Sequence, residues 1–254
     1  MNSWSKIAAT TMAGCLGALI AGTPATAAEI TAVAGAGPLP EVMGALIPVF
    51  ERASGHKVKI SFVGAPALMA QVKDGKVDLV VTGSEVVDGL IKDGAVAADG
   101  SSKIFLSRVG VAVRAGAPKP DIGTADALKA ALVAAKSVAY SQGASGQHFL
   151  TVIARLGLVD VLKPKTVVVQ GRPVGAAVAS GEAEIGVQQV AELMPVPGIT
   201  LLGPLPGDLQ KIIPYSVAVA AKAKEADAAR ALVTFLASEA AVSVFKAKGM
   251  NPPG

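Results

Sequence analysis

Residues 31–83 read TAVAGAGPLPEVMGALIPVFERASGHKVKISFVGAPALMAQVKDGKVDLVVTG, and they carry the alternating strands and helices that indicate the fold class. Short apolar runs at 30–34, 57–63 and 78–81 predict strands, with the alternation clearest in the second run. Between the first two runs, apolar residues at helical spacing predict a helix with Pro40 in its first turn. Strands separated by helices in this order predict a parallel sheet with right-handed crossovers.

The rest of the chain continues this alternation. Ser84 is expected to be the N-cap of a helix at 85–92, and Thr124 is expected to be the N-cap of a helix that runs to Ala135. Further strands are expected at 108–114, 137–140, 167–169, 185–187, 199–202 and 212–220, and closing helices at 225–237 and 239–248. The sequence therefore predicts an α/β fold of doubly wound units rather than a β-sandwich or a coiled coil.

The composition narrows the class of protein. Of the 254 residues, 52% are hydrophobic, 17% are charged and 4% are aromatic, and the net charge is +4. A chain this apolar with so little net charge can bury a core, which excludes intrinsic disorder. The basic residues are scattered, without a stripe of lysine and arginine interleaved with aromatic residues, so nucleic-acid binding is not expected.

Residues 1–28 have the composition of an export signal. One charged residue precedes an apolar run at 7–22, and the small residues TPATAA follow. This order predicts a secretory signal peptide cleaved after Ala27 or Ala28, and hence an exported protein. The alternatives are a membrane anchor, for which the run is short, and a lipoprotein signal at Cys15, which the preceding residues fit poorly.

Four turns share a composition that favours ligand binding. Each follows an expected strand, is rich in small residues and opens a helix, and they lie at 34–38, 63–67, 82–84 and 141–146. In an open α/β sheet, ligands bind beyond the carboxyl ends of the strands. Helix N-termini there present free N–H groups, and small residues let an anion approach them. Converging turns would form an anion-binding cavity, although any single one is better explained as a tight turn or a helix cap.

Few other polar residues are candidates for a site. Arg172, in a Gly-Arg-Pro turn, would pair with an anion, or it lies in solvent on the surface. Gln188 and Gln189 follow an expected buried strand and would bind a ligand or cap the next helix. His148 lies in the first turn of a helix, which favours a structural role. No nucleophile elbow, zinc motif or dinucleotide fingerprint is present, so no cofactor or metal is expected.

The mature chain resembles the type II periplasmic solute-binding proteins of ABC importers, in particular the molybdate-binding-protein-like group. The resemblance is carried by residues 31–83, by LGLVDVLKPKTVVVQGRPVGAAVASGEAEIGVQQVAEL at 156–193 and by ALVTFLASEAAVSVFKAKGM at 231–250. It implies two α/β lobes joined by two crossing strands, with the ligand in the cleft between them and a hinge motion that closes the cleft. The implied first lobe is 29–107 plus 215–254, and the second is 108–214.

The resemblance transfers only partly to the ligand site. Molybdate binders place serines in the first two turns, where this chain has Gly37 and Ala65, and a tyrosine of the family aligns with Gln189. Ser145 and Gly146 match the turn that donates backbone N–H groups. Each hydroxyl lost to a buried anion costs about 1.5–3 kcal/mol, so we expect a divergent site. The candidate ligand-binding residues are Ala36, Gly37, Gly64, Ala65, Ser84, Ser141, Ser145, Gly146, Arg172 and Gln189.

These patterns lead to one expected function and two alternatives. We expect an exported, monomeric binding protein without enzymatic activity, which captures a small anion and delivers it to an ABC permease in the inner membrane. The anion is a molybdate-like oxyanion or a small organic acid, the latter held by Arg172 with nearby serines. The first alternative is an exported hydrolase or isomerase that uses His148 and Ser145. The second is a sensory domain that passes ligand binding to a receptor.

Overall fold

The computed structural model describes residues 27–253, in which strands and helices alternate as the sequence predicts. The strands are β1 (Glu29–Gly35), β2 (Lys57–Val63), β3 (Leu79–Gly83), β4 (Val96–Arg114), β5 (Val138–Ser141), β6 (Thr166–Val169), β7 (Ile185–Gln189), β8 (Ile199–Pro204) and β9 (Ile212–Ala220). The α-helices are α1 (Leu39–Ser54), α2 (Ala65–Lys73), α3 (Ser84–Lys92), α4 (Ala125–Ala134), α5 (Ala144–Arg155), α6 (Val159–Leu162), α7 (Val174–Ala179), α8 (Val190–Leu193), α9 (Ala226–Leu236) and α10 (Glu239–Ala247). Short 3-10 helices at Lys163–Lys165 and Gly207–Leu209 complete the order.

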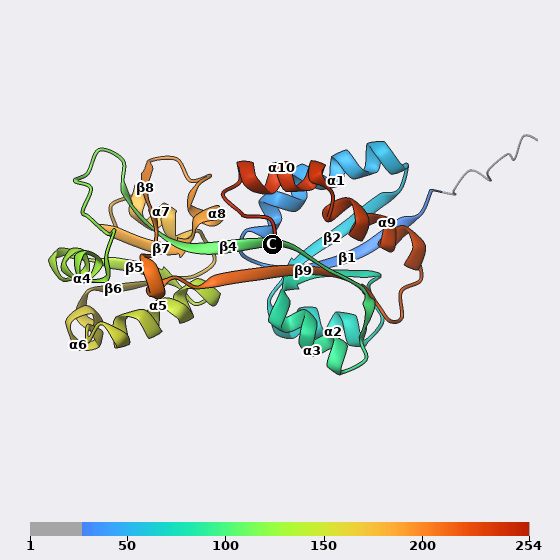
Figure 1. Cartoon of the computed structure of the whole chain (residues 1–254), viewed down its shortest axis with the longest axis horizontal. Coiled ribbons are helices and arrows are strands. Elements are labelled where there is room, and N and C mark those ends of the chain that lie inside the picture. The colour runs from blue at the N-terminus through green and yellow to red at the C-terminus, as the bar shows by residue number, and fades with distance from the viewer. Residues whose placement is uncertain (1–26, 254) are drawn as a thin grey trace, which may run out of the picture.

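Two lobes lie side by side, and β4 and β9 run between them (Figure 1). In the first lobe, β1 pairs in parallel with β2 and β3, and β3 pairs antiparallel with β9. In the second lobe, β5 pairs in parallel with β6 and β7, and β7 pairs antiparallel with β4. β4 pairs with β9 up to Arg108 and with β7 from Val109, so it changes lobes at this point. The predicted α/β fold of two lobes joined by crossing strands is confirmed.

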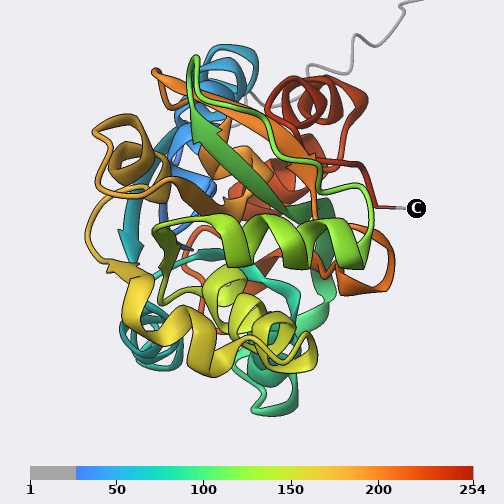
Figure 2. The same cartoon turned by 90° about the vertical axis from the view of Figure 1, so that its left-hand side faces the viewer.

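Each lobe has helices on both faces of its sheet. In the first lobe, α1, α9 and α10 cover one face and α2 and α3 the other (Figure 1). Both faces are covered because both carry apolar side chains. In β1, Ile30 and Ala32 belong to the core on one face, and Val33 belongs to the core on the other. In the second lobe, α4, α5 and α6 face the viewer in Figure 2. Within the described residues no single helix is long and apolar enough to cross a membrane, and only the bent pair α9 and α10 passes that test jointly.

We propose lobe boundaries that follow the crossing: 29–107 with 215–254 for the first lobe, and 108–214 for the second. Residues 1–26, which hold most of the predicted signal peptide, lie outside the described residues. Ala28 already contacts the first lobe. Its carbonyl oxygen accepts a hydrogen bond from the Lys57 N–H at 2.8 Å, and its own N–H donates to His56 Nδ1 at 3.2 Å. Cleavage after Ala27 would keep both bonds.

Two local predictions from the sequence are wrong. The strand expected at 108–114 begins at Val96, because the polar stretch before it pairs with β9. Ser84 does not cap α3: Gly83 is the N-cap, and the Ser84 hydroxyl lies 2.7 Å from that of Ser216 on β9. The expected cap at Thr124 is confirmed, since its hydroxyl accepts a hydrogen bond from the Ala127 N–H.

The end of the chain returns to the junction of the lobes. Asn251 exchanges two backbone hydrogen bonds with Leu106 of β4, at 2.7 and 2.9 Å. Gly249 packs against Met194, which follows α8 in the second lobe, so closely that an added Cβ would lie 2.4 Å from the Met194 sulfur. Figure 1 accordingly shows the C-terminus over β4 near the middle of the molecule. The C-terminal segment therefore contacts both lobes.

Candidate functional site

A cleft of about 1100 Å³ lies between the two lobes. All four small-residue turns line it: residues 35–38 before α1, 63–65 before α2, 82–86 at the start of α3 and 141–145 before α5. The N-termini of four helices, each nine residues or longer, thus converge on one space. Free N–H groups and partial positive charge at these termini favour an anionic ligand.

Nine of the ten candidate residues from the sequence line this cleft, and that they bind a ligand stays a prediction. Gly146 is the exception. It packs behind the turn against the backbone of Ser141, where an added Cβ would lie 1.5 Å from the Ser141 carbonyl oxygen. The tight turn thus leaves no room for a side chain at residue 146, which requires glycine there. Gly146 supports the turn that lines the cleft but does not line the cleft itself.

The serines of the cleft differ in what their hydroxyls contact. Ser145 is only 1% exposed yet lines the cleft, and among the described residues its hydroxyl has no hydrogen-bond partner. The Ser84 hydroxyl is held by Ser216, 2.7 Å away. Ser145, like Ser141, which also lines the cleft, is thus a serine whose hydroxyl is not held by another side chain of the described residues.

Two cationic side chains line the cleft, and each already has a carboxylate partner. Arg172 forms a salt bridge with Glu182 of the second lobe, and both side chains are partly exposed. Lys211, just before β9, lies 4.0 Å from Glu85 of α3 in the first lobe. An incoming anion would compete with these two carboxylates for the cations.

Glu192 is a cleft residue that the sequence analysis missed. It occupies the third position of α8, directly after β7. Gln188 Nε2 donates a hydrogen bond to Glu192 Oε1 at 2.7 Å, and the side chain and main chain of Gln189 also hydrogen-bond the carboxyl group. A glutamate that reaches back from this position to the residue before the helix forms half of a capping box, a common structural arrangement. Here the same arrangement holds a carboxyl group at a cleft.

Tyr215 and Gln189 lie beside Glu192 as a buried hydrogen-bonded pair. Gln189 Nε2 lies 3.0 Å from the Tyr215 hydroxyl oxygen, and Gln189 Oε1 lies 3.3 Å from it. A methyl group on Gly37 would lie 3.4 Å from that hydroxyl oxygen and 3.9 Å from the Glu192 carboxyl carbon. The first-lobe turn at Gly37, where φ is +87°, therefore lies against this cluster of Gln188, Gln189, Glu192 and Tyr215.

The surroundings of the cluster change its acid–base properties. Burial raises the pKa of Glu192 to about 7, and hydrogen bonds from Gln188 and Gln189 oppose that rise. Burial also raises the pKa of Tyr215 well above its usual value, and the nearby Glu192 charge adds to this effect. At neutral pH Glu192 is therefore present in both protonation states, whereas Tyr215 keeps its proton. Such a carboxyl group can both accept and donate a proton.

His148, which one alternative made catalytic, does not line the cleft. Its Nε2 lies 2.8 Å from the Leu209 carbonyl oxygen, and Thr151 Oγ1 lies 3.4 Å from its Nδ1. The histidine ties α5 to the 3-10 helix before β9, and its ring makes no hydrogen bond to Ser145. The predicted structural role of His148 fits this geometry, and the His148–Ser145 catalytic pair is not formed.

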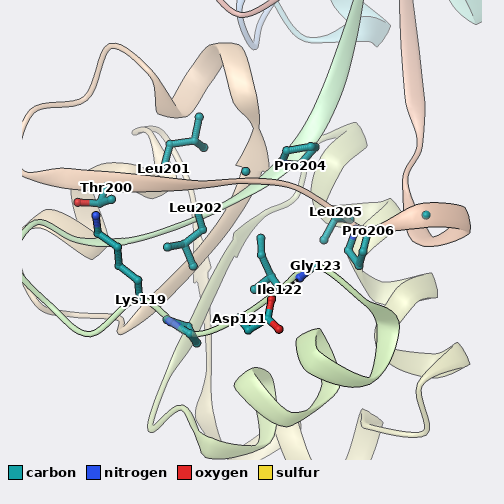
Figure 3. Close-up of a pocket in the computed structure, with 13 residues that line it drawn as sticks. Lys119, Asp121, Ile122, Gly123, Thr200, Leu201, Leu202, Pro204, Leu205 and Pro206 are labelled. Atoms are coloured by element: carbon teal, nitrogen blue, oxygen red, sulfur yellow. Dashed lines mark hydrogen bonds between the residues drawn. The ribbon is translucent and has the colours of Figure 1, made fainter.

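A second hollow of about 670 Å³ lies in the second lobe between the loop 119–123 and residues 200–207 (Figure 3). Lys119 extends from its loop toward Thr200, while Leu202 and several prolines form the wall. Its titratable side chains are Lys119 and Asp121. Within residues 27–253, no group of three or more His, Cys, Asp or Glu could hold a metal ion. The interlobe cleft is therefore the stronger candidate site.

Residues 31–251 match the model of the bacterial extracellular solute-binding proteins. The chain belongs to this family. A solved structure with the same fold is the periplasmic molybdate-binding protein of Azotobacter vinelandii, with a TM-score of 0.71, 20% identity, and coverage of 88% of this chain and 100% of the other. The molybdate-binding protein ModA of the same organism is 31% identical over 92% of this chain and 94% of its own length. The resemblance to the molybdate-binding-protein-like group is confirmed.

A further relative corrects the expected absence of enzymatic activity. The aconitate isomerase of Pseudomonas sp. is 37% identical to this chain, over 93% of this chain and 95% of its own length. The prediction of a protein without enzymatic activity is contradicted by this relative and is therefore wrong. Its physical basis was weak, because isomerisation by proton transfer requires no nucleophile elbow, zinc motif or nucleotide fingerprint. A single carboxyl group with a suitable pKa in a cleft leaves no such motif in a sequence.

Proposed function

We propose that this chain is an isomerase that shifts a proton on a small unsaturated polycarboxylate, with aconitate as the first candidate substrate. The observation that carries the proposal is the Glu192 carboxyl group, which lines the interlobe cleft with a pKa of about 7. The relative named aconitate isomerase supports the reaction class and the candidate substrate. A general acid–base group works best when its pKa lies near the working pH.

The proposed reaction needs one group that removes and returns a proton. Ionised Glu192 removes a proton from the CH₂ group that lies between a carboxylate and the double bond of the substrate. The electron pair of the broken C–H bond becomes delocalised across the three-carbon unit and its carboxylates. A proton returned to the opposite carbon moves the double bond, and it can do so in either geometry. Atoms and charge balance, and Glu192 ends as it began.

The remaining cleft groups are proposed to hold and stabilise the substrate. Arg172 and Lys211 would each pair with a carboxylate, and the N-terminus of α5 with Ser145 would hold another. Tyr215 keeps its proton and would donate a hydrogen bond where negative charge develops. The cleft of about 1100 Å³ is large enough for such a tricarboxylate together with ordered water.

A second candidate function is capture and delivery of an anion to an ABC permease, as in the family to which the chain belongs. The family match over residues 31–251 favours this role, and the same cleft would serve both functions. In either case we propose that the chain is exported to the periplasm and acts as a monomer. Binding without conversion would favour this second function.

The test is an assay of the purified mature protein with cis- and trans-aconitate in deuterated water. We expect interconversion followed by NMR, with deuterium entering the CH₂ group. We expect Glu192→Gln to lower kcat by about 10²–10⁴-fold while calorimetry still detects substrate binding. In the native protein, kcat/KM should rise with pH about a midpoint near 7, because ionised Glu192 is the base.

The matched control is Glu184→Gln, which removes a second-lobe carboxylate that does not line the cleft and contacts Lys136. It should leave kcat and the pH midpoint unchanged. No conversion of any unsaturated di- or tricarboxylate by the native protein would contradict the proposal. Undiminished turnover by Glu192→Gln would remove Glu192 from it.

A further inference from the structure

Gln188 connects the Arg172 turn to Glu192. Its side chain is 4% exposed and lies between the end of β7 and the start of α7. The Val174 N–H donates to Gln188 Oε1 at 2.8 Å, and Gln188 Nε2 donates to Glu192 Oε1 at 2.7 Å. Val174 follows Pro173, which with Arg172 lines the cleft. One amide therefore links the turn that carries a cleft cation to the cleft carboxyl group.

The orientation of this amide follows from its partners. A backbone N–H can only donate, so the oxygen of the Gln188 amide must face Val174. The NH₂ group is thereby directed at Glu192, to which it can only donate. A donor fixed in this way favours the carboxylate over the carboxylic acid. Val174 thus sets the orientation of Gln188, and Gln188 acts on the protonation state and position of Glu192.

We propose that Gln188 is a positioning residue. The Val174 N–H, at the base of the Arg172 turn, orients its amide, and the amide holds the Glu192 carboxylate in place. The proposal rests on the function proposed for Glu192 and adds the residue that prepares it. Gln188 does not touch the reacting atoms. It keeps the carboxylate ionised within an environment whose burial favours the acid, and it fixes the direction from which the proton is removed.

Other groups also face Glu192, and the test must separate their effects on its titration from the effect of Gln188. Tyr215 of β9 interacts with its charge, and Gln189 of β7 hydrogen-bonds it. Gly37, in the first-lobe turn, contributes no charge. The other charged groups of the cleft are Glu41, Glu85, Arg172 and Lys211. Substitution of Gln188 changes none of these groups chemically, and Gln188→Glu also keeps an acceptor for the Val174 N–H at the base of the Arg172 turn.

The test compares two variants that separate the two hydrogen bonds of Gln188. Gln188→Glu keeps an acceptor for Val174 but places a carboxyl group where Glu192 had a donor. Gln188→Leu removes both bonds. The readout is the titration of the Glu192 carboxyl group, measured by difference infrared spectroscopy against the same protein carrying Glu192→Gln. We expect both variants to raise the midpoint by about one pH unit or more, with Gln188→Glu the larger shift.

A matched control is Gln210→Leu, because Gln210 also bridges backbone groups, at Val109 and Leu205, and does not line the cleft. It should lower stability and leave the Glu192 titration unchanged. Unchanged titration in both Gln188 variants would overturn the proposal, as would an equal shift in Gln210→Leu. If the native protein converts no substrate, the proposed isomerase fails instead, and the titration still decides the role of Gln188. Where turnover exists, the midpoint of kcat/KM should move with the titration.

Discussion

Glu192 lies among groups that favour opposite protonation states. Burial of its carboxyl group favours the neutral acid, whereas the donors Gln188 and Gln189 favour the carboxylate. The resulting pKa of about 7 leaves both states populated at neutral pH. A residue that only capped α8 would gain nothing from this balance, because a capping glutamate stabilises its helix as the carboxylate.

The raised pKa of Glu192 predicts a cost in stability at high pH. The folded protein holds the Glu192 proton up to about pH 7, whereas the unfolded chain releases it near the ordinary glutamate pKa of 4.5. The folded state therefore binds more protons between these values, so its stability falls as pH rises through this window and is level above it. The full difference amounts to about 3 kcal/mol.

Glu192→Gln removes this titration and should be more stable than the native protein at pH 8, by about 2–3 kcal/mol. The gain should vanish near pH 4, where both folded and unfolded chains hold the proton. Urea unfolding at the two pH values measures this, with Glu184→Gln as the control that gains nothing. A variant equally stable or less stable at pH 8 would show that the ionised Glu192 carboxyl group does not destabilise the folded protein.

At the residue scale, sequence reasoning found the walls of the cleft but not the group proposed to act in it. Arg172 and Gln189 were recognisable because each follows an expected strand. Tyr215 was not, because it enters from β9, and only the tertiary pairing of strands brings it beside Gln189. Glu192 had one usable signal: it follows two glutamines after a buried strand, at the position where a helix directs its side chain back to the strand end.

At the scale of elements, the turn between β5 and α5 depends on Gly146. The Ser141 carbonyl oxygen occupies the place of any Cβ at that position. We expect Gly146→Ala to shift the start of α5, and hence Ser145, at a cost of more than about 2 kcal/mol in unfolding free energy. Ligand binding should weaken in parallel, as calorimetry would show.

Gly44 provides the matched control for Gly146. It lies exposed within α1, and an added Cβ meets nothing within 4 Å. Gly44→Ala should stabilise the protein by about 0.5–1 kcal/mol, because alanine has the higher helix propensity. Thermal unfolding of the two variants should therefore move in opposite directions. Equal effects of the two substitutions would contradict the tight turn at Ser141.

The helices and most strands could be predicted because apolar spacing is a local property. The first half of β4 could not, because its residues Ser101 to Lys103 are polar and are held by pairing with β9, which is distant in sequence. The role of Ser84 failed for a related reason. Its hydroxyl has a nearer partner in Ser216 than the local backbone offers, and this partner also comes from β9.

At the scale of the whole molecule, the cleft between two lobes predicts stabilisation by ligands that contact both. A ligand at 100 times its Kd adds about 2.7 kcal/mol to the folded state. For a domain pair of this size that corresponds to a rise in Tm of roughly 5–10 °C. We expect this shift with trans-aconitate and a much smaller one with molybdate, because Gly37, Ala65 and Gln189 supply no hydroxyl groups. A nanomolar Kd for molybdate in calorimetry would reverse this expectation.

The C-terminal segment contacts both lobes, through Leu106 of β4 and Met194 next to α8. An affinity tag or reporter fused after Gly254 would therefore emerge at the seam where the halves meet, a few residues from the helix that bears Glu192. Assays on such a fusion would measure the effect of the added segment on the cleft together with the activity of the protein itself. Purification through a tag attached ahead of Ala28, at the start of β1 and at the end of the first lobe that lies away from the junction (Figure 1), leaves that seam undisturbed.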